Sequence, residues 1–201
     1  MLHVEHPSIS KSASARLDSY IAMLLRWNAA VNLISAHDVD AVRRRHVADC
    51  LQLIPLLPPD CERGIDLGSG AGLPGLVLAI ATGIKFDLIE ADQRKAAFLR
   101  EAARVTEAPV TVHAARIEAL ELPPAPLITA RALARLPRLL ALAAPKLAKD
   151  GVCLFLKGAG ARTELTEAGR EWHMRVAQIP SRTDPSATIL RISEIVCVAR
   201  A

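Results

Sequence analysis

A glycine-rich stretch at residues 66–75, Asp-Leu-Gly-Ser-Gly-Ala-Gly-Leu-Pro-Gly, constrains the fold of this chain more than any other segment. Residues 64–67 predict a short apolar strand that leads into it, and residues 74–82 predict a buried helix that Gly83 ends. Glycine lets the backbone adopt a positive φ and lets a ligand approach without a Cβ in its way. A strand, a glycine-rich turn and a helix in this order are typical of a nucleotide-binding loop.

From residue 60 onward the chain alternates between predicted strands and helices, which indicates an α/β fold. Further strands are expected at residues 85–89, 110–113, 127–130, 151–156, 174–179 and 188–198, and helices at residues 93–106, 135–149 and 163–170. The last two strands have no helix between them, which predicts an antiparallel C-terminal hairpin at the edge of the sheet. We therefore expect a doubly wound, mostly parallel, seven-stranded sheet with its ligand at the carboxyl ends of the strands.

The first part of the chain predicts a helical N-terminal extension packed on this sheet. After a loose leader at residues 1–13, apolar residues recur at helical spacing over residues 14–27, and Asp38 is a candidate N-cap for a second helix. A cluster of prolines ends that helix and marks a boundary. We expect residues 1–59 to form the extension and residues 60–201 to form one compact main domain.

Composition limits the setting and the partners of the chain. A net charge of +4 permits an anionic partner without requiring one. The absence of CxxC spacing favours buried free thiols in a reducing cytoplasm over a disulfide framework or a metal site. The cysteines are Cys50, Cys61, Cys153 and Cys197. With no signal pattern and no apolar run of membrane-spanning length, we expect a soluble, cytoplasmic protein.

Two registers are open for the glycine-rich loop. Residues 70–75 match the GxGxxG dinucleotide fingerprint, which alone is a weak signal. Because the predicted strand ends at Leu67, Gly68 is the better first glycine, and residues 68–72 then form a GxGxG turn. We expect Asp66 to face the cleft, where its carboxylate would repel a pyrophosphate and suit the ammonium and sulfonium groups of S-adenosylmethionine.

Two acidic segments after the next strands are candidates for adenosine contacts. Glu90 follows the second strand, where a carboxylate can accept hydrogen bonds from both ribose hydroxyls of NAD or of S-adenosylmethionine. The alternative for Glu90 is an ordinary surface carboxylate. The segment Arg116-Ile117-Glu118 after the third strand can hold an adenine, or it is a loop with a solvated charge pair.

Several short motifs, taken in order, resemble one family. They are Trp27-Asn28 with Asn32-Leu33, Arg45-His46 with Asp49, the stretch 66–75, Arg131-Ala132 and Lys157-Gly158. Over about residues 17–158 the chain resembles the bacterial RsmG (GidB) methyltransferases, which methylate N7 of a guanine in small-subunit (16S) ribosomal RNA. The resemblance implies the Rossmann-like fold of class I methyltransferases and S-adenosyl-L-methionine as cofactor. It implies cofactor contacts at Gly68, Leu73, Ile117, Glu118 and Arg131.

The chain also departs from that family. Leu133 stands where an aromatic residue is common, and nothing is carried over beyond residue 158. Rival functions from other classes are a methyltransferase for another RNA or a small molecule, an NAD-dependent oxidoreductase, and a non-catalytic cofactor-binding scaffold. We expect a monomer that acts on ribosomal RNA of the small subunit, either naked or within an assembled particle.

Arg131, at the end of the fourth strand, is the candidate catalytic residue. Guanine N7 has a free lone pair, so the enzyme needs to align the base and not to deprotonate it. An arginine can donate two hydrogen bonds to the O6 side of guanine. The alternative is that Arg131 only pairs with Glu118 or Asp66. His46 and Asp49 share one helical face and predict a polar pair that fixes the extension to the sheet.

The predicted site consists of cofactor contacts and a basic rim. The cofactor contacts are Asp66, Gly68, Ser69, Gly70, Gly72, Leu73, Glu90, Ile117, Glu118 and Arg131. Basic residues expected to surround the cleft and contact RNA phosphates are Arg43, Arg44, Arg45, Arg94, Lys95, Arg135 and Lys157. Because only 3% of the residues are aromatic, RNA binding should rest on charge and not on base stacking.

Overall fold

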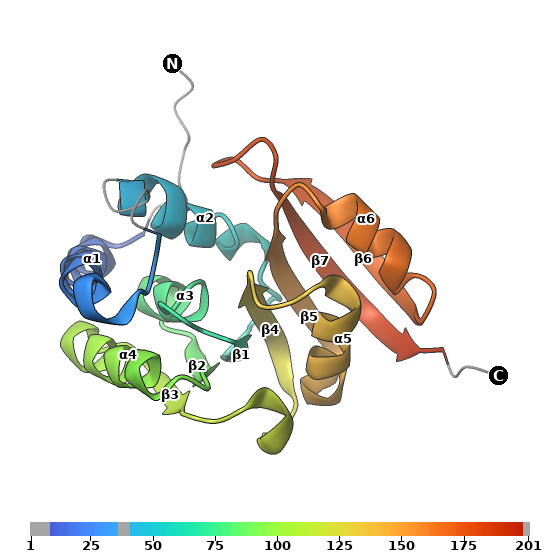
Figure 1. Cartoon of the computed structure of the whole chain (residues 1–201), viewed down its shortest axis with the longest axis horizontal. Coiled ribbons are helices and arrows are strands. Elements are labelled where there is room, and N and C mark those ends of the chain that lie inside the picture. Colours follow the sequence, from blue (N-terminus) through green and yellow to red (C-terminus); the bar gives the residue numbers. More distant parts are fainter. Residues whose placement is uncertain (1–8, 36–40, 199–201) are drawn as a thin grey trace.

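A seven-stranded sheet runs through the computed structural model, which describes residues 9–35 and 41–198 (Figure 1). Its strands are β1 (Arg63–Leu67), β2 (Lys85–Ile89), β3 (Val110–His113), β4 (Ala125–Arg131), β5 (Leu147–Lys157), β6 (Trp172–Pro180) and β7 (Thr188–Cys197). The spatial order is β3-β2-β1-β4-β5-β7-β6, and β1 to β5 are parallel. The predicted doubly wound sheet is confirmed. The hairpin is antiparallel as predicted; β6 is the edge strand on this side of the sheet, and β7 lies between β5 and β6.

Helices cover both faces of the sheet (Figure 1). Apolar side chains of α1 (Lys11–Val31), α3 (Gly75–Thr82) and α4 (Gln93–Thr106) form one core cluster. The opposite cluster contains α5 (Leu136–Ala143) and the buried end of α6 (Ala161–Ala168). The two clusters leave the carboxyl ends of β1, β2 and β4 at one edge, where the glycine-rich loop lies.

The N-terminal extension shares the core of the main unit. Leu17, Tyr20 and Leu24 of α1 are fully buried in the same cluster as α3 and α4. The side chain of Ser10 begins α1 by accepting a hydrogen bond from Ala13 N (3.1 Å), and Asn32 ends it in a left-handed conformation. The division of the chain at residue 59 stays a prediction.

Two helix predictions are wrong. The helix expected over residues 135–149 ends at Ala143, because Pro145 cannot continue it, and the chain enters β5 after a 3₁₀ turn, Ala144–Lys146. The second helix of the extension is also not continuous. A π-helical turn at Val42–Val47 leads into α2 (Ala48–Leu51) and a 3₁₀ turn at Ile54–Leu56, whereas the predicted N-cap Asp38 lies outside the described residues.

Other elements follow the sequence closely. The bounds of β2, β3 and α4 are those predicted, and a 3₁₀ turn, Ile117–Ala119, follows β3. All four cysteines are free. Cys50 and Cys153 are buried and Cys61 is partly buried, whereas Cys197 is exposed, so the expectation of burial is wrong for Cys197. No helix within residues 9–35 and 41–198 is long and apolar enough to cross a membrane.

Candidate functional site

The glycine-rich loop adopts the GxGxG register. Gly68, Gly70 and Gly72 have φ of +65°, +53° and +89°, a region that residues with a Cβ rarely adopt, whereas Gly75 has no positive φ. The loop is tied to β2 by Ser69 N, which donates to Ile89 O (3.0 Å). The prediction that Gly68 is the first glycine of the turn is therefore confirmed.

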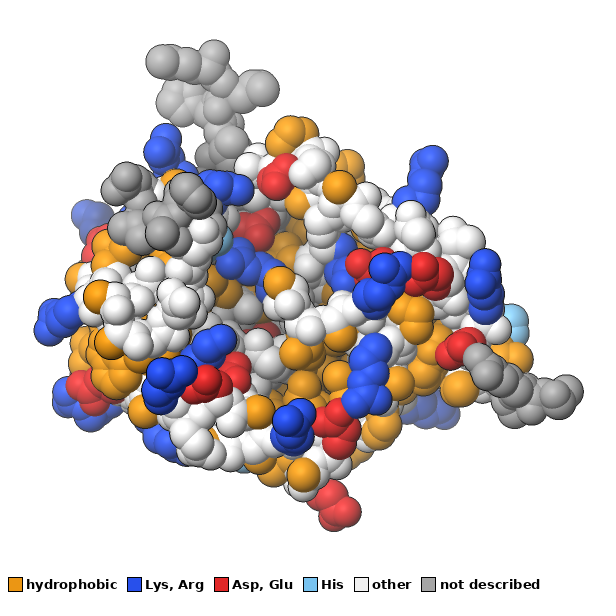
Figure 2. Space-filling model, viewed as in Figure 1, with side chains coloured by type: hydrophobic (Ala, Val, Ile, Leu, Met, Phe, Trp, Pro, Cys, Tyr) orange, Lys and Arg blue, Asp and Glu red, His pale blue; other side chains and the backbone are white. Residues whose placement is uncertain are grey.

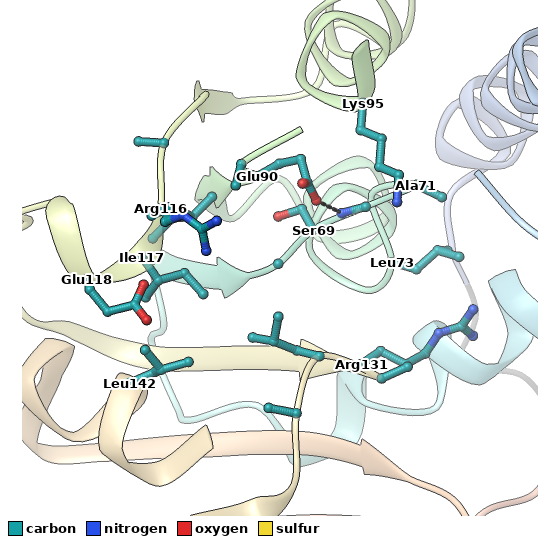
Figure 3. Close-up of a pocket in the computed structure, with 18 of the residues that line it drawn as sticks. Ser69, Ala71, Leu73, Glu90, Lys95, Arg116, Ile117, Glu118, Arg131 and Leu142 are labelled. Carbon is teal, nitrogen blue, oxygen red and sulfur yellow. Dashed lines mark hydrogen bonds between the residues drawn. The ribbon is translucent and has the colours of Figure 1, made fainter. Parts of the chain in front are cut away.

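A cavity of about 530 Å³ opens beside this loop at the carboxyl ends of the strands (Figure 3). Its volume lies in the usual range for a small-molecule site. Figure 3 shows Glu90, Ile117 and Arg131 around the cavity on three different segments. The predicted cofactor contacts that line it are Gly68, Ser69, Gly70, Leu73, Glu90, Ile117, Glu118 and Arg131.

Gly72, a further predicted contact, is not among the residues that line this cavity. A Cβ at Gly72 would lie 2.8 Å from Leu76 Cβ, so this glycine permits close packing of the loop on α3. Sequence reasoning missed another close approach. A Cβ at Gly68 would lie 2.5 Å from Leu133 Cδ1, because Leu133 covers the loop from the segment after β4.

Glu90 holds the loop in place. Its Oε2 accepts a hydrogen bond from Gly70 N (2.8 Å), drawn as a dashed line in Figure 3, and its Oε1 accepts one from Asp92 N (2.8 Å). A carboxylate has about four acceptor positions, so each oxygen can still accept a further hydrogen bond. Glu90 is thus a fixed acceptor in the cavity wall and not an ordinary surface carboxylate.

Asp66 does not face the cavity, so the predicted orientation is wrong. Side chains alternate along a strand, and Ile65 and Leu67 of β1 point into the cluster that contains α5. Asp66 therefore points to the opposite face, fully buried, and accepts a hydrogen bond from Thr129 Oγ1 (2.6 Å). Its carboxyl also packs against Gly75, the first residue of α3, because a Cβ at Gly75 would lie 2.7 Å from Asp66 Cγ.

Burial governs the ionisation of Asp66. Loss of hydration raises the pKa of this carboxyl from 3.8 to about 6, and the hydrogen bond from Thr129 offsets only part of the effect. A carboxyl in this position joins β1, β4 and the start of α3 beneath the loop. It supports the loop from below and is not among the residues that line the cavity.

Arg131 is held by the N-terminal extension. Its Nη1 donates to Asp49 Oδ2 (3.2 Å), and its Nη2 lies 2.9 Å from His46 Nδ1. The alternative that Arg131 pairs with Glu118 or Asp66 is wrong; Glu118 instead pairs with Arg138. The prediction that His46 and Asp49 fix the extension to the sheet is confirmed.

Two smaller cavities meet at Arg131. One has a volume of about 400 Å³ and shares the segment 131–134 with the larger cavity. The other, about 170 Å³, lies between Asp49 and the turn that joins β6 to β7. Ala132 has a φ of +52°, which costs about 1–2 kcal/mol for a residue with a Cβ. Such strained residues cluster at functional sites.

The predicted basic rim is largely paired with acids. Figure 2 shows Lys and Arg side chains around the hollow in this face, with acidic side chains beside several of them. Lys95 lines the cavity of about 530 Å³, and Arg45 lines the cavity of about 170 Å³. Three arginines of the predicted rim form ion pairs: Arg43 with Asp18, Arg94 with Asp92, and Arg135 with Glu167.

Lys157, another predicted RNA contact, is mostly buried and lines the cavity of about 400 Å³. Its side chain is only 8% exposed, it pairs with Glu164 Oε2 (2.6 Å), and it donates to Ala134 O (2.8 Å). These bonds hold the segment 131–134 from within the protein, and a contact of Lys157 with RNA stays a prediction. Arg44 is exposed, and its role in RNA binding, like that of the paired arginines, stays a prediction.

Comparisons with known proteins agree on one family. A family model for rRNA small subunit methyltransferase G (GidB) matches residues 13–189. The ribosomal RNA small subunit methyltransferase G of Granulibacter bethesdensis is 59% identical over 187 residues, which cover 93% of this chain and 88% of the relative. The protein of the same name from Gluconobacter oxydans is 54% identical, with 93% and 96% covered.

Solved structures share the fold. An O-methyltransferase from Bacillus cereus in complex with SAH has a TM-score of 0.62 at 16% identity, covering 95% of this chain and 94% of that one. The glycopeptide N-methyltransferase MtfA complexed with S-adenosyl-L-methionine also has a TM-score of 0.62, at 12% identity, with 74% and 94% covered. At these identities the likeness concerns the arrangement of strands and helices.

Proposed function

The chain belongs to the rRNA small subunit methyltransferase G (GidB) family, and from this premise we infer that it transfers a methyl group from S-adenosyl-L-methionine to N7 of a guanine in small-subunit (16S) ribosomal RNA. The observation that carries the proposal is the position of Arg131. This side chain lines both the cavity beside the glycine-rich loop and the neighbouring cavity, so it lies where a methyl donor and an acceptor base would meet.

The larger cavity suits the cofactor. The positive-φ glycines leave the backbone of residues 68–70 open to a ligand, and Glu90 offers acceptor positions for ribose hydroxyls. Ile117 adds an apolar wall for an adenine ring. When bound, S-adenosyl-L-methionine supplies a methyl group on a positively charged sulfur. Asp66 takes no direct part in this binding, because it is buried beneath the loop.

The second cavity suits the acceptor nucleotide. A base that is to be methylated has to leave its stack and enter a pocket of the enzyme. The cavity of about 400 Å³ lies within the range of small-ligand sites. Its shared wall, residues 131–134, is held by Lys157 through Ala134 O. This wall can therefore keep the base and the methyl donor in a fixed relation.

The chemistry needs alignment more than proton removal. Guanine N7 carries a lone pair at neutral pH, so no base has to take a proton before attack. Methylation leaves a positive charge on the ring, which an isolated arginine would oppose. Arg131 is paired with Asp49, so the two side chains together carry little net charge. The arginine can then donate to O6 from the edge of the base and orient it.

The test is single-turnover methylation of 16S ribosomal RNA, both naked and within the small subunit, with the product mapped. We expect N7-methylguanosine and a rate without a steep rise near neutral pH. Arg131→Ala should slow the reaction by about 10²–10³-fold, and Arg131→Lys should restore little because an ammonium lacks the planar fork.

The matched control is Arg63→Ala, which removes an arginine that pairs with Asp87 and lines none of the three cavities. This variant should keep the wild-type rate. Methylation of N1, N2 or a ribose, or full activity in Arg131→Ala, would overturn the proposal.

A further inference from the structure

We propose that Asp49 is a positioning residue for Arg131, and that the turn between β6 and β7 fixes Asp49 and so belongs to the active site. The inference rests on the proposed function, in which Arg131 orients the acceptor base. It concerns a part of the chain, residues 181–187, for which the sequence predicts no role. Asp49 lines the two smaller cavities, so it lies beside the place where the base would enter.

Both oxygens of Asp49 are engaged. Oδ2 accepts from Arg131 Nη1 at 3.2 Å. Oδ1 accepts from Gln52 Nε2 at 2.7 Å, from Thr183 Oγ1 at 2.8 Å and from Ser181 Oγ at 3.4 Å. With three donors on one oxygen, the carboxylate plane cannot rotate without breaking hydrogen bonds. The hydrogen bonds to Oδ1 therefore set the orientation of Oδ2, the oxygen that accepts from Arg131.

Gln52 connects this carboxylate to the backbone of the turn. The residue is only 7% exposed. Its Oε1 accepts from Arg182 N (2.9 Å), and its Nε2 also donates to Ser181 Oγ (3.1 Å). The turn is closed by Ser181 N, which donates to Ala187 O (3.1 Å). A buried amide with both ends bonded is a rigid link, because breaking either end leaves a polar group without a partner.

The guanidinium is thereby held at two points. His46 Nδ1 lies 2.9 Å from Nη2, while Asp49 accepts from Nη1. Two contacts on different nitrogens fix the plane of the guanidinium and engage two of its five N–H donors. An arginine that is already oriented loses less conformational freedom when it binds a base.

The chain contains a second cluster of the same composition that serves as a control. Asp87 accepts from Arg63 Nη2 (2.8 Å) and lies 2.7 Å from His113 Nε2. Its side chain is 15% exposed, the same fraction as that of Asp49. Asp87 lines none of the three cavities. Removing its charge therefore tests the cost of breaking such a cluster without touching the site.

The experiment compares Asp49→Asn with Asp87→Asn in single-turnover methylation of small-subunit ribosomal RNA. We expect Asp49→Asn to be slower by about 10²-fold, as for a catalytic group misplaced by about 1 Å, with S-adenosylhomocysteine affinity changed less than about twofold. Asp87→Asn should keep the wild-type rate although both variants lose thermal stability. Thr183→Val removes one donor to Asp49 and should give an intermediate rate.

A double mutant separates positioning from a general structural role. If Asp49 acts through Arg131, Asp49→Asn should cause no further loss of rate in an Arg131→Ala background. Equal rates for Asp49→Asn and Asp87→Asn, or losses that multiply in the double mutant, would overturn the inference.

Arginine side-chain NMR gives a readout that does not depend on the substrate. In the wild type the Nη protons of Arg131 should be resolved because rotation of the group is hindered, and in Asp49→Asn they should average. Absence of any methylation by the wild type would reject the proposed function alone, since the NMR comparison still decides this inference. Free rotation of the Arg131 guanidinium in the wild type would overturn the inference that Asp49 positions Arg131.

Discussion

Asp66 should make the protein less stable as pH rises, which is opposite to the usual effect of a carboxyl group. Burial raises its pKa from 3.8 to about 6, so the folded state binds this proton more tightly than the unfolded chain does. Stability is therefore lost as pH rises from about 4 to about 6. With the carboxyl ionised at neutral pH, the full cost is about 3 kcal/mol.

The perturbation that isolates this effect is Asp66→Asn. Asparagine does not titrate, so any packing cost of the substitution is the same at every pH. The unfolding free energy of the wild type minus that of the variant should fall by about 2 kcal/mol between about pH 4.5 and about pH 7.5. Urea denaturation at a series of pH values measures both free energies.

Asp92 provides a control of opposite sign. The backbone amide of Lys95 is the main cause that lowers the pKa of this exposed carboxyl, which is the N-cap of α4. The unfolding free energy of the wild type minus that of Asp92→Asn should therefore rise with pH. A difference for Asp66→Asn that stays constant or rises would refute the burial of an ionisable carboxyl beneath the loop.

Two further predictions concern the cofactor and the RNA. Glu90→Gln places an amide nitrogen against Gly70 N or Asp92 N and should weaken S-adenosylhomocysteine binding by about 1–3 kcal/mol in calorimetry. The same change at Glu101 on α4 should leave binding intact, and equal affinity in both variants would contradict the role of Glu90. Replacing the arginines at residues 43–45 should lower the salt dependence of RNA binding by about one unit of slope per lost phosphate contact. An unchanged slope would mark them as a solvated surface.

Local features of this protein could be predicted from its sequence. The positive φ of Gly68, Gly70 and Gly72 follows from residues that need no Cβ within a short turn. The start of α4 follows from Asp92, whose side chain accepts from Arg94 N and Lys95 N. These features depend on residues a few positions apart, so neighbouring residues suffice to determine them.

The order of strands was predictable in part. Alternating strands and helices imply parallel pairing, which the pairing of β1 to β5 confirms. The insertion of β7 between β5 and β6 was not predictable from the hairpin pattern alone. That insertion sets the position of the turn that reaches Asp49, because β7 pairs with β5 and thereby places residues 181–187 next to the extension.

The sequence by itself thus determined the glycine-rich loop, its register and the carboxylate of Glu90 at the end of the next strand. Only the tertiary structure decided that Asp66 turns away from the cavity and that Arg131 is held by Asp49. The first depends on which face of the sheet α3 covers, since adjacent strand residues point to opposite faces. The second joins residues 82 positions apart, and such partners meet only after the sheet and the extension have packed together.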